Sequence, residues 1–375
     1  MTNDLTPSTR ADISAIVTTP VANRAAYVDV FRGLLIAHMA LDHASLMFNV
    51  GRGGEELATS APVITGLGEF LTRFTGVPVA PGFFFMAGFM VALTSVARVA
   101  RGIGEHEVTK RLLIRGAVLI AVDAIVMGLP RALMGFYSFM VLSSIGVGII
   151  ALAWLRHLPN RILLPAALAV LLLHPLLDLS QWPVALRAII HEPVRSGAIR
   201  SLYPVIPWIA VVVLGFVAGR IVSQRTIDGR TWVRLATLCL ALFLAVRLTG
   251  GYGNAYDHAG LWTMEFWLFA KYPPDLAFLS WSFACIFAAL AILQAVTRHG
   301  IPYVLHPFAI FGRVPFFFYV VHFYVLGVAM ALMRTRFGLA ETYGIWILLL
   351  IVMAWPCVWY YRKKTERPNF ITRYF

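Results

Sequence analysis

The feature that most constrains this chain is a succession of long apolar stretches that begins near residue 27 and continues almost to the C-terminus. A membrane-spanning helix needs about 20 mostly apolar residues. Only 13% of the residues are charged, whereas soluble domains average about 25%. The sequence therefore predicts an all-α, polytopic membrane bundle. We expect ten spans, at about 27–49, 78–97, 112–130, 136–155, 162–179, 203–222, 232–250, 276–296, 308–333 and 343–361.

Lysine and arginine residues are distributed unequally between the predicted loops. With the N-terminus inside, the inner segments hold 19 of the 31 such residues and the outer segments hold 9. Because inner loops are enriched in these residues, we expect both termini in the cytoplasm. We divide the chain into a polar N-terminal segment (1–26), a transmembrane domain (27–361) and a basic cytoplasmic tail (362–375).

The same distribution accounts for the net charge of +13 without a nucleic-acid partner, because the basic residues form short caps and no continuous basic face. Residues 1–26 lack the apolar core of a cleavable signal peptide. The cysteines, Cys239, Cys285 and Cys357, lie inside apolar segments without disulfide or metal spacing. We therefore expect free cysteines and no metal.

The first predicted span carries five ionisable side chains: Asp29, Arg32, His38, Asp42 and His43. A charge at the bilayer centre costs about 2.5–3.5 kcal/mol, so such residues usually face a partner or an aqueous cavity. At about 100° per residue, Asp29, Arg32 and His43 share one stripe of the helix, and His38 faces the other way. Asp29 and Arg32 are one turn apart and can pair, and that pair is either structural or part of a site.

The ninth predicted span repeats this arrangement in the same direction, with Arg313 near its cytoplasmic end and Tyr319 and His322 deeper in the membrane. Guanidinium groups grip phosphate in a forked geometry, so two arginines on the cytoplasmic side suit a phosphorylated donor. A neutral histidine deeper in the bundle suits proton abstraction. The alternative is that these histidines only pack, but two parallel helices of this kind favour a functional site.

Other polar residues receive weaker assignments. Asp42 lies about 100° round the helix from His43 and is a secondary candidate for orienting it. Asp123 and Arg247 are predicted to stabilise the bundle or to line a cavity. The long outer loop 251–275 contains Lys271 and Tyr272 and is a place where an acceptor could be held.

Five segments carry a family resemblance: VDVFRGLLIAHMALDH, FLTRFTGVPVAPGFFFMAGFMVAL, LYPVIPWIAVVVLGFVAG, KYPPDLAFL and FGRVPFFFYVVHF. In this order, from about residue 24 to 335, the chain resembles bacterial membrane proteins related to heparan-alpha-glucosaminide N-acetyltransferase. The spacing of Arg32, ten residues and His43 is also similar to the signature of a broader set of integral-membrane O-acyltransferases.

The resemblance implies an enzyme of the bacterial cytoplasmic (inner) membrane. It would transfer an acyl group, most simply acetyl, from cytoplasmic acyl-CoA to a hydroxyl or amine of an extracytoplasmic glycan or other small-molecule acceptor. His43 would be the general base or an acyl-carrying nucleophile. The residues assigned on this basis are His43, Asp42, His322 and Tyr319 for catalysis; Arg32, Arg313 and Asp29 for the donor; and Lys271, Tyr272 and Trp208 for the acceptor.

The chain departs from the lysosomal branch of this family in one respect. The resemblance implies a catalytic histidine in the loop after the first span, but no histidine occurs between His43 and His106. His43 must therefore take that role if the chemistry is the same.

Two other readings stay open at this point. The chain could be a transporter or flippase for a phosphorylated or glycosylated lipid, although no duplicated halves are visible. It could also be a non-catalytic membrane assembly protein whose buried charges only fix packing. The acceptor, the acyl chain length, the choice between direct transfer and an acyl-histidine, and assembly into a homo-oligomer are not determined by the sequence.

Overall fold

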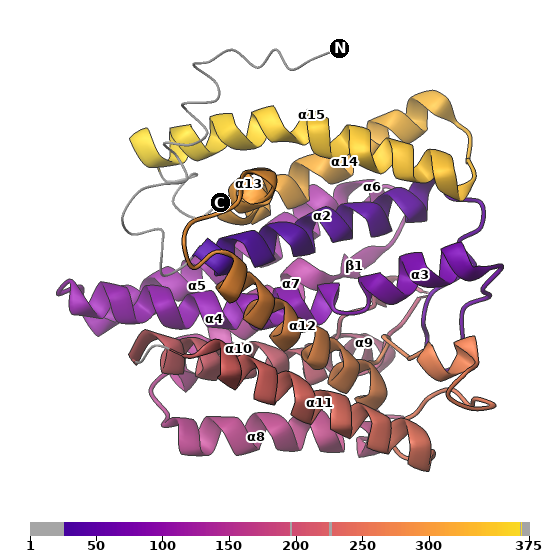
Figure 1. Cartoon of the computed structure of the whole chain (residues 1–375), viewed down its shortest axis with the longest axis horizontal. Coiled ribbons are helices and arrows are strands. Elements are labelled where there is room, and N and C mark those ends of the chain that lie inside the picture. The colour runs from indigo at the N-terminus through magenta and orange to yellow at the C-terminus, as the bar shows by residue number, and fades with distance from the viewer. Residues whose placement is uncertain (1–25, 196, 225–226, 368, 370–375) are drawn as a thin grey trace.

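A computed structural model of the protein describes residues 26–195, 197–224, 227–367 and 369, which form a bundle of roughly parallel and antiparallel helices (Figure 1). Among these residues, six helical segments are long and apolar enough to cross a membrane. They are α3 with α4 (Leu67–Gly76 and Val79–Ala100), α10 (Val205–Gln224), α11 (Gly229–Thr249), α12 (Leu276–Val296), α14 (Pro315–Met333) and α15 (Leu339–Glu366). The helical membrane fold is confirmed; the count of ten spans and the orientation stay predictions.

The other predicted spans also coincide with helices. These are α2 (Ala26–Phe48), α5 (Glu105–Ala121) with a π-helical continuation (Val122–Met127), α7 (Val141–Leu155) and α8 (Asn160–Leu173). Shorter elements are α6 (Leu129–Ala132), α9 (Val184–Ile190), α13 (His306–Arg313) and 3-10 turns at His174–Leu176, Met264–Trp267 and Tyr303–Leu305. Two short strands, β1 (Tyr137–Phe139) and β2 (Ile199–Ser201), pair in parallel with Tyr137 opposite Ile199. The three cysteines are free.

The structure corrects three boundaries. The expected loop 50–77 contains helix α3, which buries Phe70 but is too short and too polar to stand out as a span. The ninth expected span is two helices, because α13 ends before Pro315, whose ring disfavours helical geometry at Val314. The expected tail from residue 362 begins inside a helix, since α15 continues to Glu366. The predicted N-terminal segment lies outside the described residues except for Ala26.

Two pairs of helices touch backbone to backbone through glycines. A methyl group on Gly33 of α2 or Gly312 of α13 would come within 1.7 or 1.8 Å of a backbone oxygen of the other helix. Gly88 of α4 and Gly215 of α10 meet in the same way. Small residues let membrane helices approach closely, since association there relies on backbone and van der Waals contact. The α2–α13 contact fixes the helix that carries Arg32 and His43.

Arg247 and Asp123, two other charged residues within predicted spans, form hydrogen bonds to backbone groups. The Arg247 guanidinium, fully buried, donates to the carbonyl oxygens of Phe266 and Glu265 at 2.8 and 2.7 Å. The Asp123 carboxylate accepts from the backbone N–H of Ser143 at 2.9 Å. Neither residue lines the cavity described below. Their contacts support the bundle-stabilising alternative.

Candidate functional site

One cavity runs alongside α2 and has charged residues at two well-separated places. Arg32 and Arg115 line one part of it, which we call the Arg32 end. We call the other part the His43 end; its polar lining residues include Asp42, His43, Glu56, Arg73, Tyr203, Lys271 and Tyr319. Arg32 and His43 are eleven residues apart on one helix, which corresponds to about 16 Å. The wall between them is mostly apolar and includes Met39, Phe83, Met86, Ile145 and Phe316.

His43 and His322 form a direct pair at the His43 end. The His43 Nδ1 and His322 Nε2 atoms are 2.9 Å apart, and the two rings are nearly parallel with an interplanar angle of 7°. His43 lines the cavity, whereas His322 is fully buried behind it. The first and ninth predicted spans thus contact each other through His43 and His322. In the sequence, only their similar order of arginine and histidine relates them.

The hydrogen bonds of this pair fix its tautomers. The His322 Nδ1 atom lies 2.9 Å from the carbonyl oxygen of Phe318, and a carbonyl can only accept. Nδ1 of His322 therefore carries the hydrogen, and in the neutral ring its Nε2 accepts from His43 Nδ1. Neutral His43 is left with an unprotonated Nε2, the nitrogen that this pairing does not use. A free imidazole lone pair beside a cavity is what a general base requires.

Tyr319 borders the same region. Its ring centroid lies 6.3 Å from that of His43 in an edge-on arrangement, and its side chain lines the cavity. Within the described part of the chain, the Tyr319 hydroxyl makes no hydrogen bond. It is therefore available to a bound molecule.

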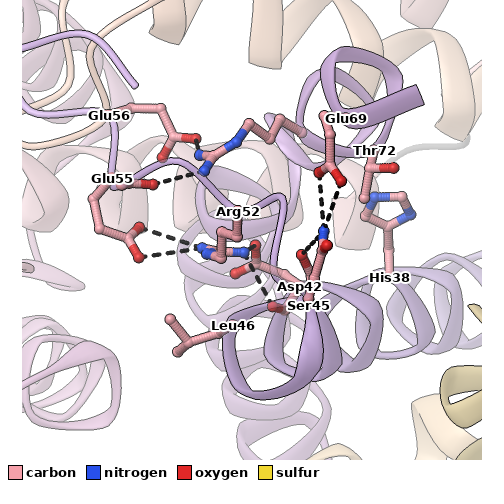
Figure 2. A network of polar contacts seen from close by, with 12 residues as sticks. His38, Asp42, Ser45, Leu46, Arg52, Glu55, Glu56, Glu69 and Thr72 are labelled. Atoms are coloured by element: carbon pink, nitrogen blue, oxygen red, sulfur yellow. Dashed lines mark hydrogen bonds and ion pairs between the residues drawn. The ribbon is translucent and has the colours of Figure 1, made fainter. Parts of the chain in front are cut away.

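Beside the histidine pair, the acidic residues of the His43 end are each matched by an arginine (Figure 2). Arg52 donates to Asp42 at 2.7 Å and contacts Glu55 at 3.2 Å. Arg73 donates to Glu56 at 2.6 Å. The two guanidinium groups are largely buried, with side-chain exposures of 8% and 7%. These pairs fold the 49–66 loop back onto α2 and α3.

The same loop is anchored a second time away from the cavity. Asn49 donates to both carboxylate oxygens of Glu69, at 3.0 and 2.9 Å, which ties the end of α2 to α3 (Figure 2). His38 lies on this side, where its Nε2 is 3.2 Å from the Thr75 hydroxyl, and it does not line the cavity. Its predicted separation from His43 is therefore confirmed.

Lys271 enters the His43 end from the segment before α12. Its backbone N–H donates to the Glu56 carbonyl at 2.9 Å, and its ammonium lies 5.1 Å from the ring centroid of Tyr272 and 5.9 Å from that of Tyr203. Burial acts to lower the pKa of Lys271, but Tyr203, Asp42 and the neighbouring glutamates act more strongly in the other direction. The pKa of Lys271 is therefore raised and the amine stays protonated.

The two other residues assigned to the acceptor do not line the cavity. Trp208 is fully buried and stacks on Phe84 with ring centroids 4.5 Å apart. The Tyr272 hydroxyl is 3.1 Å from that of Tyr203. Tyr203, not singled out in the sequence, is the aromatic residue of this group that faces the cavity.

At the Arg32 end, the Asp29 carboxylate forms ion pairs with two arginines. Asp29 is 3.5 Å from Arg32 and 3.3 Å from Arg313. Arg313 also lies over the Tyr361 ring, 5.3 Å from its centroid, and it is not among the cavity-lining residues. The predicted juxtaposition of Arg32 and Arg313 is thus present, but Arg313 reaches Asp29 and not the cavity.

Arg115 lines the cavity, although in the sequence it looks like one more basic residue of the group Lys110, Arg111 and Arg115 at the start of a predicted span. Within the described residues it makes no hydrogen bond or ion pair. The charges that act on it are those of Arg32 and Arg98, and Lys364 is within electrostatic range of both Arg32 and Arg115. Several cationic side chains therefore lie close together at the Arg32 end, an arrangement that suits an anionic ligand.

The described residues contain no group of three or more histidine, cysteine or acidic side chains placed to hold a metal ion.

Comparison with known proteins identifies one family. The model of that family is described as heparan-alpha-glucosaminide N-acetyltransferase, catalytic, and it matches residues 24–247. This range includes Arg32, His43 and Arg115 but ends before Lys271 and His322. A comparison with curated proteins finds no match. Because the family match covers more than half of the 375 residues, this multi-pass membrane protein belongs to the heparan-alpha-glucosaminide N-acetyltransferase catalytic family.

Proposed function

We propose that the protein transfers an acyl group, most simply acetyl, from cytoplasmic acyl-CoA to a hydroxyl or amine of an acceptor at the opposite membrane face. The acceptor is a glycan or a similar small molecule, and the membrane is the bacterial inner membrane. The family supplies the reaction class. The observation that carries the proposal is one cavity that joins two arginines, Arg32 and Arg115, to an unprotonated imidazole nitrogen of His43.

The Arg32 end suits the phosphates of the donor. Arg32 and Arg115 both face the cavity, and their forked guanidinium groups can each bind a phosphate in bidentate fashion. Asp29 holds Arg32 in place, and Arg313 neutralises Asp29 from the other side. Bound phosphates would replace the missing counter-charge, so donor binding would relieve repulsion between the arginines.

The His43 end suits the transfer step. His43 Nε2 takes the proton of the acceptor hydroxyl or amine as the acceptor heteroatom attacks the thioester carbonyl carbon. When the tetrahedral species collapses, the carbon–sulfur bond breaks and the CoA thiolate recovers that proton from His43. His322 does not touch the substrate; it positions His43 and keeps its proton on Nδ1. Lys271 and Tyr203 face the acceptor, and Asp42 is held by Arg52 as a nearby negative charge.

Radiolabelled acetyl-CoA tests the proposal directly. Purified protein in lipid nanodiscs would be incubated with the label and with methyl α-D-glucosaminide as an amine probe or methyl α-D-glucoside as a hydroxyl probe. Labelled product from either probe supports acyl transfer, and the preferred probe identifies the acceptor group. Donor binding without product from either probe, and without hydrolysis, would contradict the enzyme and favour the transporter reading.

The side of each substrate is tested separately. In sealed vesicles of known orientation, labelled acetyl-CoA on the cytoplasmic face should acetylate a probe trapped on the other face. Reaction only when donor and probe share one face would contradict transfer across the membrane while leaving the acyltransferase itself intact.

A further inference from the structure

Acyl transfer places a negative charge on the carbonyl oxygen, and the neutral histidine pair offers that oxygen no free N–H group. Attack on the thioester moves the carbonyl π electrons onto oxygen, and an oxyanion needs hydrogen-bond donors placed in advance. His43 Nε2 is an acceptor in the neutral pair, and His322 is buried behind it. The donors must therefore come from other residues of the His43 end.

Most polar donors at this end are already committed. Arg73 donates to Glu56 and to the Gly54 carbonyl. The indole N–H of Trp267 donates to the Leu261 carbonyl at 3.2 Å. Tyr203 shares its hydroxyl contact with Tyr272. These groups hold the loops together and have little capacity left for a substrate.

Two cavity-lining donors remain, the Lys271 ammonium and the Tyr319 hydroxyl. Neither makes a side-chain hydrogen bond or ion pair with any residue that the structure describes. Asp42, Glu55 and Glu56 act electrostatically on Lys271, but each of them is paired with an arginine instead. Lys271 is thus a half-buried cation beside the rings of Tyr203 and Tyr272, and its ammonium N–H groups make no hydrogen bond with the described residues.

The position of Lys271 is fixed from two directions. The Glu56 carbonyl accepts from the backbone N–H groups of both Lys271 and Tyr272, at 2.9 and 3.1 Å. On the other side, Asp275 accepts from the Ala270 N–H and caps α12 through the Phe278 N–H, at 3.1 and 2.6 Å. The charge of Lys271 is near enough to act on that of His43. Such a preorganised donor is what stabilises a transition-state charge without reorganisation.

We propose that Lys271 is a catalytic residue that donates to the thioester oxyanion, with the Tyr319 hydroxyl as second donor. The proposal rests on the acyltransferase function proposed above. It adds the cation that stabilises the negative charge formed on the thioester oxygen. As His43 removes the acceptor proton and the new carbon–heteroatom bond forms, the carbonyl oxygen becomes negative against the Lys271 ammonium. Lys271 keeps its proton throughout, and the oxyanion returns its electrons to carbon as the thiolate leaves.

The test is the separation of kcat from KM in Lys271→Met, which keeps the length of the side chain and removes the charge. With acetyl-CoA and whichever methyl glycoside probe the wild type accepts, kcat should fall about 10²–10³-fold, as when one oxyanion donor is removed. KM for the probe should change little. Lys271→Arg should recover part of the loss, Tyr319→Phe should show a smaller fall, and Lys110→Met, an exposed lysine on α5, should match the wild type.

The opposite pattern would overturn the proposal. If Lys271 only binds the acceptor, Lys271→Met raises KM for the probe, leaves kcat nearly unchanged and does not slow acetyl-CoA hydrolysis by water. Acetyl-CoA affinity of Lys271→Met, measured by calorimetry, checks that the variant is folded. A wild type that neither transfers nor hydrolyses would overturn the acyltransferase function and this role together, whereas an active Lys271→Met overturns the Lys271 role alone.

Discussion

The two ends of the cavity differ in how their charged side chains are paired. At the His43 end, Asp42, Glu55 and Glu56 are held by Arg52 and Arg73, and Lys271 rests on aromatic faces. At the Arg32 end, Asp29 is shared between two arginines and Arg115 has no acidic partner among the described residues. Among the described residues, the charged side chains of the His43 end are matched in sign, whereas Arg115 at the Arg32 end faces the cavity without an acidic partner.

This difference indicates what each end binds. Because a charge in an apolar helix is costly unless it is compensated, uncompensated arginines indicate an anionic ligand that supplies the compensation. A self-neutralised end favours a ligand without a large net charge. The comparison therefore supports our proposal that a phosphorylated donor binds at the Arg32 end and that an uncharged sugar hydroxyl or a neutral amine binds at the His43 end.

The largest effect should come from His43. His43→Ala should lower transfer about 10²–10⁴-fold, the usual contribution of a general base, while acetyl-CoA affinity stays within a few-fold of wild type. His38→Ala, on the other face of α2, is the matched control and should keep most activity. Turnover per folded molecule decides the matter, and wild-type turnover in His43→Ala would show that the histidine only packs.

The next effect should be confined to the Arg32 end. Arg115→Gln removes a charged hydrogen-bond donor worth about 1.5–3 kcal/mol, so acetyl-CoA affinity should fall roughly 10–100-fold. The salt dependence of binding should weaken as well, because fewer charges contact the phosphates. Arg111→Gln on the same helix is the control, since Arg111 pairs with Glu107 at 2.7 Å. Equal donor affinity in both variants, measured by calorimetry, would remove Arg115 from the donor site.

A smaller effect on activity should follow from changing Asp275, which anchors the segment that carries Lys271. Asp275→Ala removes the N-cap of α12, which typically stabilises a helix by about 0.5–2 kcal/mol. We expect a lower melting temperature and a reduced kcat, since the Lys271 segment loses its anchor, with unchanged acetyl-CoA affinity. Asp275→Asn, which can still cap the helix, should lie between the two. Loss of donor affinity in Asp275→Ala would indicate that the ends are not independent.

The smallest effect concerns a second histidine pair outside the cavity. His174 Nδ1 and His191 Nε2 are 3.2 Å apart, and burial lowers the pKa of His191 below its ordinary value of 6.5. The unfolded chain then binds the proton more readily, so the stability from this group is complete above pH 6.5 and declines as the pH falls below it. Melting temperatures from pH 7.5 to 5.5 should fall less in His191→Gln than in wild type. Parallel curves would show that His191 makes no contribution.

The sequence predicts which residues of the first span share a helical face better than it predicts where helices begin and end. Helical periodicity placed Arg32 and His43 on one stripe and His38 on another, because a 3.6-residue period needs no tertiary information. The α3 helix was missed since its ten residues are short and carry Glu69 and Arg73. The break at Val314 follows from Pro315, but only the structure shows that it separates two helices.

The remaining features of the site depend on contacts between distant segments. The pairing of His43 with His322 joins residues 279 positions apart, and no local pattern specifies it. Arg115 could have been suspected as a charge close to the start of an apolar stretch, but its exposure to the cavity is a property of packing. The matching of Asp42 with Arg52 depends on how the 49–66 loop folds back.

Because Arg32 and His43 lie on the same unbroken helix, α2 acts as a molecular ruler. Movements of neighbouring helices can widen or narrow the cavity, but they cannot change the interval of about 16 Å set by eleven residues at the helical rise. A donor would be selected by the length of the arm between its phosphates and its thioester, before any contact with the acyl group. Insertion of one residue between the two would advance His43 by about 1.5 Å and turn it by about 100°, out of the cavity.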